Sequence, residues 1–254
     1  MPPVEIDGNP ITGATIDGTD VQEITVDGDV VFTSGPQPPS PGNLVIHVDA
    51  SQESLSNNAT TTTVTDFSGN GNDFTSQFNG AVTYKSNAIG GLPAFEVNDH
   101  RFRSASNVTL TSPISAAAVY EQNPGNGQAQ ILNMGGSGFE IRRDTGEFET
   151  DAMMRMDVSS QIGFKANMGD GSGSPESFIG VISSSTYQGE LNGTSVSSLD
   201  SFVVQTINEP VDLFMDATRN TRGLKGLLSE VLLYDTAVNF TDLSDYIQNK
   251  YGTF

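Results

Sequence analysis

Residues 226–252 carry the clearest pattern of hydrophobic and polar positions in the chain. From Leu227 to Tyr234 the sequence reads LLSEVLLY, with apolar residues at both odd and even positions. Because side chains alternate between the two faces of a strand, this predicts a strand that is covered on both sides. The expected faces are Leu227, Val231 and Leu233 on one side, and Leu228, Leu232 and Tyr234 on the other.

A short amphipathic helix is predicted directly after this strand. Four apolar residues stand at the spacing of one helical face, namely Leu243, Tyr246, Ile247 and Tyr251. Thr241 is expected to cap the N-terminus of the helix, and Gly252 is expected to end it. We expect the apolar stripe to pack on the sheet beside the preceding strand.

The rest of residues 43–254 predicts short strands separated by turns rich in Gly, Asn, Asp and Ser. The strands expected before residue 226 are 44–48, 94–97, 116–120, 130–134, 139–143, 147–151, 162–166, 178–183, 189–191, 202–207 and 211–215. Strands at this spacing are typical of an all-β protein. We expect a two-sheet antiparallel jelly-roll sandwich with a short C-terminal helix.

The first 33 residues contain a ten-residue repeat. Ile6-Asp7-Gly8, Ile16-Asp17-Gly18 and Val26-Asp27-Gly28 are evenly spaced, and Asp-Gly favours tight turns. Three or four short strands are therefore expected in a strand-rich N-terminal segment, residues 1–33. Four prolines make residues 34–42 a stiff linker to the domain 43–254.

The N-terminal segment is short for a structure that folds alone, since domains below about 40 residues usually need additional support. We expect residues 4–33 to act as an anchor that docks on a partner chain or on other copies of this chain. The alternative is a self-contained meander that rests on its own main domain.

Five stretches together resemble a known family. They are 44–51 (LVIHVDAS), 65–74 (TDFSGNGNDF), 90–97 (GGLPAFEV), 189–194 (GELNGT) and the closing strand and helix from GLLSEVLLYD to KYG. Their order and spacing are similar to the concanavalin A-like lectin/glucanase superfamily, and most closely to laminin-G-like modules of bacterial, phage and archaeal virus proteins. The resemblance implies the jelly-roll fold, but it implies no single activity because the superfamily holds lectins, hydrolases and structural modules.

The chain is strongly acidic, with 31 Asp and Glu against 11 Lys and Arg and a net charge of −20. Such a surface repels nucleic acid. In molar salt the Debye length falls to about 3 Å, and self-repulsion largely disappears. Acidic residues spread along the chain therefore favour a halophilic setting, and an acidic surface kept for solubility is the alternative.

The chain has no cysteine, which excludes disulfides and thiolate metal sites. Its start, MPPVEIDGNP, lacks the basic and apolar regions of a signal peptide. No apolar run approaches the roughly 20 residues that span a bilayer. We therefore expect synthesis in a host cytoplasm without a signal peptide and without membrane insertion.

Three acidic residues are the strongest candidates for catalysis. Glu147, Glu149 and Asp151 alternate, so they would share one face of the expected strand 147–151. Glucanases of the superfamily place their nucleophile and acid on such a strand. The order Glu-x-Glu-x-Asp departs from the family's Glu-x-Asp-x-x-Glu, and the chain has no tryptophan. A solvent-facing acidic row in a protein that is not an enzyme is the preferred interpretation, and a glycoside hydrolase is the alternative.

Arginines near the same strand suggest a ligand site. Arginine forks bind carboxylates and sugar hydroxyls, so short clusters of Arg in an acidic chain indicate a site for an acidic glycan. The alternative is that these arginines neutralise neighbouring Asp and Glu residues within the protein. Arg101 and Arg103 form a second short cluster, and the same two explanations apply to it. The expected ligand-binding residues are Arg142, Glu149, Asp151, Arg155 and Tyr187.

One loop is rich in oxygen ligands. Asp66, Asn70, Asn72 and Asp73 could hold Ca²⁺, as the rims of related modules sometimes do. Asn-Gly and Ser-Gly pairs make turns without a metal, so we expect a structural loop and no cofactor.

Together these features predict a virion surface structural protein, either a capsid spike or a tail-fibre component. Its lectin-like head would bind host-surface glycans or glycoproteins, and its anchor would hold it to other virion proteins. Weak single sites gain avidity from repeated copies, so a homo-oligomer is expected. A particle-stabilising module without any ligand is a further alternative.

Overall fold

The computed structural model describes residues 5–6, 9–10, 15–16, 19–20, 23–26, 29–33, 36–78, 80–111, 113–124, 129–135, 139–144, 151–156, 163–167, 173–182, 187–196, 198–199, 206–215 and 223–252. The chain divides into two compact units, Met1–Pro38 and Pro39–Phe254. Each unit is described by itself.

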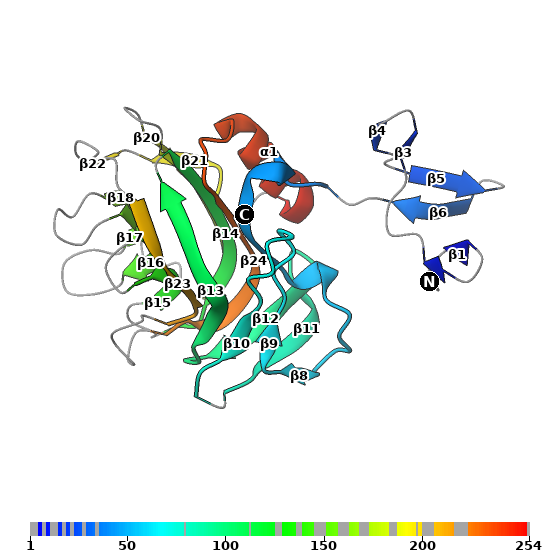
Figure 1. Ribbon diagram of the computed structural model, residues 1–254, viewed down its shortest axis with the longest axis horizontal. Helices are drawn as coiled ribbons and strands as arrows, with labels where there is room; N and C mark the ends of the chain where they lie inside the picture. Colours follow the sequence, from blue (N-terminus) through cyan, green and yellow to red (C-terminus); the bar gives the residue numbers. More distant parts are fainter. Residues whose placement is uncertain are drawn as a thin grey trace. The chain divides into compact units, whose positions relative to one another are not determined.

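The described residues of the first unit form three β-hairpins (Figure 1). They are β1 (Glu5–Ile6) with β2 (Asn9–Pro10), β3 (Thr15–Ile16) with β4 (Thr19–Asp20), and β5 (Glu23–Val26) with β6 (Asp29–Thr33). In each hairpin, one Asp-Gly pair lies between the last two residues that pair across the strands. These paired residues are Ile6–Asn9, Ile16–Thr19 and Val26–Asp29. The expected number of three or four strands was therefore too low, because each repeat supplies a whole hairpin.

The second unit is a sandwich of two antiparallel sheets, as predicted (Figure 1). One sheet, here called the helix-covered sheet, has the order β21-β20-β19-β14-β24-β12-β11-β8, and β7 pairs with β24 as well. Its strands are β7 (Leu44–Asp49), β8 (Thr60–Thr61), β11 (Val82–Ile89), β12 (Leu92–Asn98), β14 (Ile114–Gln122), β19 (Pro175–Ile182), β20 (Tyr187–Leu191), β21 (Thr194–Val196) and β24 (Lys225–Tyr234).

The other sheet, here called the opposite sheet, has the order β22-β18-β17-β16-β15-β23-β13-β10-β9. Its strands are β9 (Thr63–Val64), β10 (Phe74–Ser76), β13 (Phe102–Thr111), β15 (Ala129–Met134), β16 (Phe139–Asp144), β17 (Asp151–Met156), β18 (Gly163–Asn167), β22 (Ser198–Leu199) and β23 (Thr206–Leu213). Two short 3-10 turns, η1 (Pro41–Asn43) and η2 (Ala50–Gln52), flank β7.

Two hydrophobic clusters stabilise this unit. The larger lies between the sheets and includes Phe95, Tyr120 and Val231 from one sheet with Leu132 and Leu213 from the other. The smaller lies between the helix-covered sheet and helix α1 (Phe240–Tyr251), and it contains all four predicted stripe residues, Leu243, Tyr246, Ile247 and Tyr251. The predicted packing of the helix on the sheet is therefore confirmed.

Helix α1 begins two residues earlier than the sequence suggested. Asn239, not Thr241, is the N-cap, and its side chain accepts hydrogen bonds from the backbone N–H groups of Thr241 and Asp242. Gly252 ends the helix with a φ of 81°, as predicted. Helix α1 has 12 residues, and no helix in the described part of the chain is long and apolar enough to cross a membrane.

The faces of β24 differ from the predicted alternation. Val119 pairs with Glu230 and Tyr120 pairs with Leu228, so Ser229 is an extra residue in a β-bulge. The bulge places Leu228 in the cluster between the sheets, together with Val231 and Leu233. As a result, Ser229 and Glu230 both contact the helix.

The long polar strands were not predicted, and some predicted boundaries were wrong. Strands β11 and β13 contain many Ser, Thr and Asn residues, which made them resemble loops. The predicted strands 202–207 and 211–215 correspond to one strand, β23, and residues 201–205 lie outside the described residues. Strand β17 begins at Asp151, where the predicted strand 147–151 was expected to end.

Candidate functional site

The opposite sheet carries a row of polar residues across five strands. Arg103 pairs with Asp212, Asp212 with Asn133, Asn133 with Glu140, and Glu140 with Arg155. We call these five residues the polar row. Their neighbours Phe102, Leu213, Leu132 and Ile141 lie in the cluster between the sheets. Because alternate residues face opposite sides, Arg103, Asp212, Asn133 and Glu140 belong to the outer face of the sheet.

Asp212 is the centre of one charged group in the row. Its Oδ1 accepts hydrogen bonds from Arg101 Nε at 2.9 Å and from Arg103 Nε at 2.8 Å. Its Oδ2 accepts from Arg101 Nη2 and Arg103 Nη2, each at 2.9 Å. Both oxygens of this buried carboxylate are thus held by two arginine forks, an arrangement that neutralises charge within the protein.

Glu140 is the centre of a second charged group. Its Oε1 lies 3.2 Å from Arg142 Nη1, and its Oε2 accepts a hydrogen bond from Gln130 Nε2 at 2.8 Å. Gln130 and Glu140 are buried. Arg142, which was predicted to bind a ligand, therefore contacts a carboxylate of its own strand, two residues earlier in the chain.

Of the other predicted ligand and catalytic residues, three lie on described strands and two lie outside the described residues. Asp151 and Arg155 lie on β17, and Tyr187 begins β20. Glu147 and Glu149 lie outside the described residues. Asp212, Asn133 and Gln130 were not predicted as site residues. The alternation of Glu140 and Arg142 on either side of Ile141 was the sequence signal for this outer face.

The loop rich in oxygen ligands forms a hydrogen-bonded turn. Asp66 Oδ1 accepts from the backbone N–H of His47 at 3.0 Å, and Asp66 Oδ2 accepts from that of Asn72 at 3.1 Å. Asp73 Oδ1 accepts from the N–H of Asp66 at 2.9 Å, and the Asn70 amide donates to the Leu44 carbonyl at 2.8 Å. These contacts attach the turn to β7, the role expected for a structural loop.

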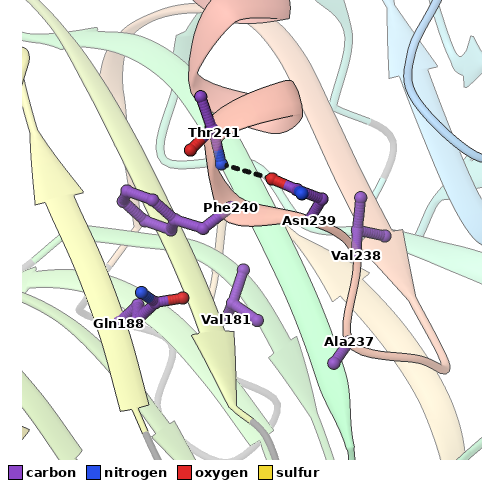
Figure 2. A pocket seen from close by; sticks show the side chains of 7 residues that line it. All are labelled: Val181, Gln188, Ala237, Val238, Asn239, Phe240 and Thr241. Atoms are coloured by element: carbon purple, nitrogen blue, oxygen red, sulfur yellow. Dashed lines mark hydrogen bonds between the residues drawn. The ribbon is translucent and has the colours of Figure 1, made fainter.

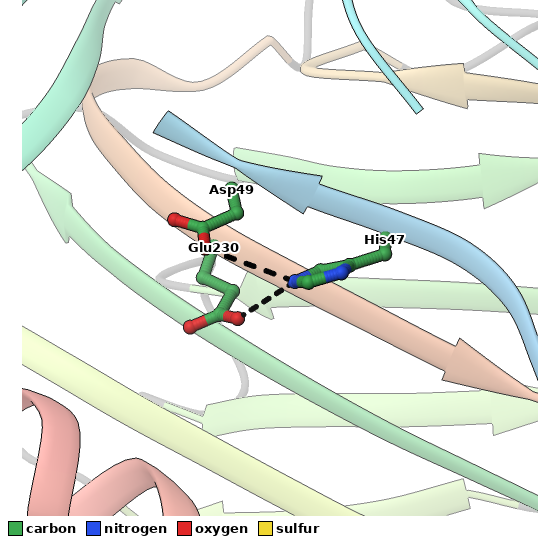
Figure 3. Close-up of side chains that lie close together, drawn as sticks. All are labelled: His47, Asp49 and Glu230. Atoms are coloured by element: carbon green, nitrogen blue, oxygen red, sulfur yellow. Dashed lines mark hydrogen bonds and ion pairs between the residues drawn. The ribbon is translucent and has the colours of Figure 1, made fainter. Parts of the chain in front are cut away.

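A buried charged group connects β7, β24 and α1. His47 and Asp49 come from β7 and Glu230 from β24, and Figure 3 shows the three side chains converging. Lys250 Nζ lies 2.7 Å from Asp49 Oδ2 and 3.0 Å from Glu230 Oε2. Tyr246 donates a hydrogen bond of 2.6 Å to Glu230 Oε1, which also lies 3.0 Å from His47 Nε2. We call these five residues the lysine cluster.

The lysine cluster has the ligand types of a small metal site. One ligand atom from each of His47, Asp49 and Glu230 lies within 4.8 Å of the others. Lys250 already supplies a positive charge to both carboxylates. Burial opposes ionisation of Asp49, but Lys250, Ser51 and Gln52 outweigh it and hold the pKa of that carboxyl below its usual value. The geometry is that of a structural ion-pair network.

An accessible pocket lies where the start of α1 meets strands β19 and β20. Its volume is about 370 Å³, and we call it the rim pocket (Figure 2). Val181 and Val238 are buried, whereas Gln188, Asn239 and Thr241 are exposed and Phe240 is half-buried. The lining residues are Val181, Gln188, Ala237, Val238, Asn239, Phe240 and Thr241. The pocket thus combines apolar surface with amide and hydroxyl groups.

The wall of the rim pocket is fixed by a buried serine. Ser115 of β14 accepts a hydrogen bond from the Val238 N–H at 2.8 Å and donates one to the Thr236 carbonyl at 2.9 Å. Asn239 Oδ1 is bound to the N–H of Thr241 at 2.9 Å. The segment before α1 is therefore held in one conformation, which lowers the entropy lost when a ligand binds.

Comparison with known proteins relates the fold to other β-sandwiches. No known protein family matches the sequence, and no curated protein matches it. Among solved structures, the chain is similar to domain 4 of AbnA, a GH43 extracellular arabinanase from Geobacillus stearothermophilus, determined in complex with arabinotriose. The identity is 15%, the match covers 80% of this chain and 98% of that chain, and the TM-score is 0.62.

Two toxin domains have a more distant likeness. The botulinum neurotoxin type G receptor binding domain is 13% identical over 83% of this chain, with a TM-score of 0.52. The binding domain of botulinum neurotoxin serotype D/C VPI 5993 is 9% identical over 83% of this chain, with a TM-score of 0.51. The match spans about half of each toxin chain, 54% and 53%. At these identities the likeness shows the β-sandwich fold, which is compatible with the concanavalin A-like resemblance.

Proposed function

We propose that residues 39–254 form a carbohydrate-binding module and that the rim pocket is its binding site. The observation that carries this proposal is the lining of the pocket, which includes both the Phe240 ring and the Gln188 carboxamide (Figure 2). A sugar ring presents an apolar C–H face and a rim of hydroxyls. It therefore requires an apolar or aromatic surface next to groups that both donate and accept hydrogen bonds.

One further fact supports the proposal. The similar domain of the arabinanase was solved with an oligosaccharide bound.

The biological setting that we propose is the surface of a virion, where the module recognises glycans or glycoproteins of a host. Three hairpins in residues 5–33 suit an anchor to other virion proteins or to further copies of the chain. A net charge of −20 suits a saline environment. On this proposal the protein is made in the host cytoplasm and several copies act together.

The test is binding of the labelled full chain, in molar salt, to a glycan array and to candidate host cells before and after removal of their surface glycans. We expect binding that is lost on glycan removal and lost in Phe240→Ala. Phe78→Ala is the matched control, because Phe78 is 62% exposed and does not line the pocket. Binding to no glycan would refute the proposal.

The same samples test the enzymatic alternative. Release of sugar by the wild-type chain that disappears in Glu149→Gln would indicate a glycoside hydrolase that uses Glu147, Glu149 or Asp151. Absence of release together with glycan binding would leave the binding module.

A further inference from the structure

We infer that the rim pocket accepts an uncharged sugar and rejects acidic sugars such as sialic acid or uronic acids. This inference rests on the proposed function and adds the class of ligand. It also differs from the acidic glycan that the arginine clusters suggested.

The chain segments that form the pocket contain no cationic residue. Its lining residues come from β19, β20, the segment before α1 and the first two residues of α1. Residues 166–218 and 226–249, which include all of these elements, contain no Lys, Arg or His. They do contain Asp235, Asp242 and Asp245, all of which are exposed. Among the described residues, the lining of the pocket therefore offers no cation to a negative ligand.

The start of a helix often binds anions, but here that role is already filled. The Asn239 side chain accepts hydrogen bonds from the backbone N–H groups of Thr241 at 2.9 Å and Asp242 at 3.3 Å. The Leu243 N–H donates to the Asn239 carbonyl at 3.1 Å. Asp242 places a carboxylate in the first turn, where it offsets the positive end of the helix dipole. The helix therefore offers little attraction to an anionic sugar.

The arginine side chains that the structure describes are engaged elsewhere. Arg101 and Arg103 both contact Asp212 of β23, and Arg142 contacts Glu140 of β16. Lys250, at the far end of α1, contacts Asp49 and Glu230. None of these four cationic residues lines the rim pocket.

The polar groups of the pocket match neutral hydroxyls. A carboxamide such as that of Gln188 can donate to one hydroxyl and accept from its neighbour, and the hydroxyl of Thr241 can do the same. A volume of about 370 Å³ lies near the lower end for small-molecule sites, about 300–1,000 Å³. The pocket is therefore suited to one or two sugar units, such as the end of a glycan chain.

The experiment is calorimetric or NMR titration of the full chain with two ligand panels at 0.15 M and 2 M NaCl. One panel contains neutral hexose and pentose glycosides and their oligomers, and the other contains sialyllactose and oligogalacturonate. We expect a neutral sugar to bind at both salt concentrations and the acidic sugars to bind at least tenfold more weakly at low salt. Binding of the neutral sugar should weaken about tenfold in both Phe240→Ala and Gln188→Ala.

The possible results distinguish a failure of this inference from a failure of the proposed function. Gln188 is exposed, so Gln188→Ala should fold even if Phe240→Ala does not. Phe78→Ala should bind as the wild type does. Preference for acidic sugars at the pocket would overturn this inference and keep the proposed function. Neutral-sugar binding that neither pocket variant changes would overturn the pocket as the site, and binding of neither panel would overturn the proposed function as well.

Discussion

Replacing Lys250 by methionine should destabilise the protein far more than removing an ordinary surface lysine. In the folded protein, the side chains of Asp49 and Glu230 are 3% and 1% exposed, and Lys250 is the lysine that contacts both. Methionine keeps most of the aliphatic volume but removes the charge. Two buried carboxylates would then lose their shared cation, although Asp49 keeps its bonds from Ser51 and Gln52.

The expected loss follows from the cost of leaving a buried charge without its partner, about 3–5 kcal/mol. For a domain of this size, 1 kcal/mol corresponds to a change in Tm of about 2–4 °C, so the Tm should fall by roughly 10 °C. Lys85→Met is the matched control. Lys85 lies 3.0 Å from Glu96, but the two side chains are 30% and 53% exposed, and such surface pairs contribute about 0–1 kcal/mol.

The assay is differential scanning calorimetry of the full chain at 0.15 M and 2 M NaCl, with near-UV circular dichroism of the tyrosines as a second probe. High salt screens the surface pair but not the buried one, so the deficit of Lys250→Met should persist at 2 M. The triple variant that also carries Asp49→Asn and Glu230→Gln should regain part of the lost stability. Equal effects of Lys250→Met and Lys85→Met would refute the reasoning.

The pH dependence gives an independent check on the same variant. In the wild type, Asp49 has a lowered pKa, so its contribution to stability is present above the unfolded pKa and is lost as the pH falls through the folded value. In Lys250→Met, burial would dominate and raise the pKa of the Asp49 carboxyl, so this variant should gain relative stability as the pH falls. The difference between the two proteins should therefore shrink below about pH 5.

Three further predictions concern other buried groups. Burial, and then the Glu230 carboxylate, raise the pKa of Tyr246 and of Tyr251. The folded protein therefore keeps these two protons above about pH 10, whereas the unfolded chain releases them. The free energy of unfolding should then fall by up to about 1.4 kcal/mol per pH unit for each tyrosine. Denaturant titrations between pH 9 and 11 measure this, and a flat profile would contradict it. Asp212→Asn should lower the free energy of unfolding by about 3 kcal/mol in the same assay, because it removes the buried carboxylate that both Arg101 and Arg103 contact. A loss no larger than that of Lys85→Met would contradict this. Gly226→Ala should lower the free energy of unfolding by at least about 2 kcal/mol, because Gly226 has a φ of 153° and an added Cβ would clash with the Glu121 carbonyl. An unchanged Tm would show that the backbone there adjusts freely.

The parts of the fold that could be predicted from sequence are those whose hydrophobic or turn pattern lies within one short segment of the chain. The apolar run of β24 and the stripe on α1 are local patterns, and both gave correct elements. The same holds for the repeated Asp-Gly turns of the first unit, although the number of strands was underestimated. The missed strands β11 and β13 are rich in Ser, Thr and Asn, because one of their faces does not contribute to the core.

The features that could not be predicted depend on register between distant strands. The polar row needs five strands to align, and a one-residue shift in any of them would change its members. The lysine cluster joins Asp49 to Lys250, 201 residues away. The bulge at Ser229, which turns Glu230 toward the helix, has no signal in the alternation of the strand. The rim pocket likewise requires the segment before α1 to meet the hairpin β19–β20.

The position of β24 has a consequence for how the protein is made. It is the last described strand in chain order, yet it lies at the centre of the helix-covered sheet and pairs with β14, β12 and β7. Until residues 225–234 leave the ribosome, the edges of these three strands have no central partner. Such unpaired edges promote association between nascent chains. Folding of this sheet must therefore wait until residues 225–234 have been synthesised, and a chain that stops before residue 225 loses the middle of the sheet instead of an edge strand.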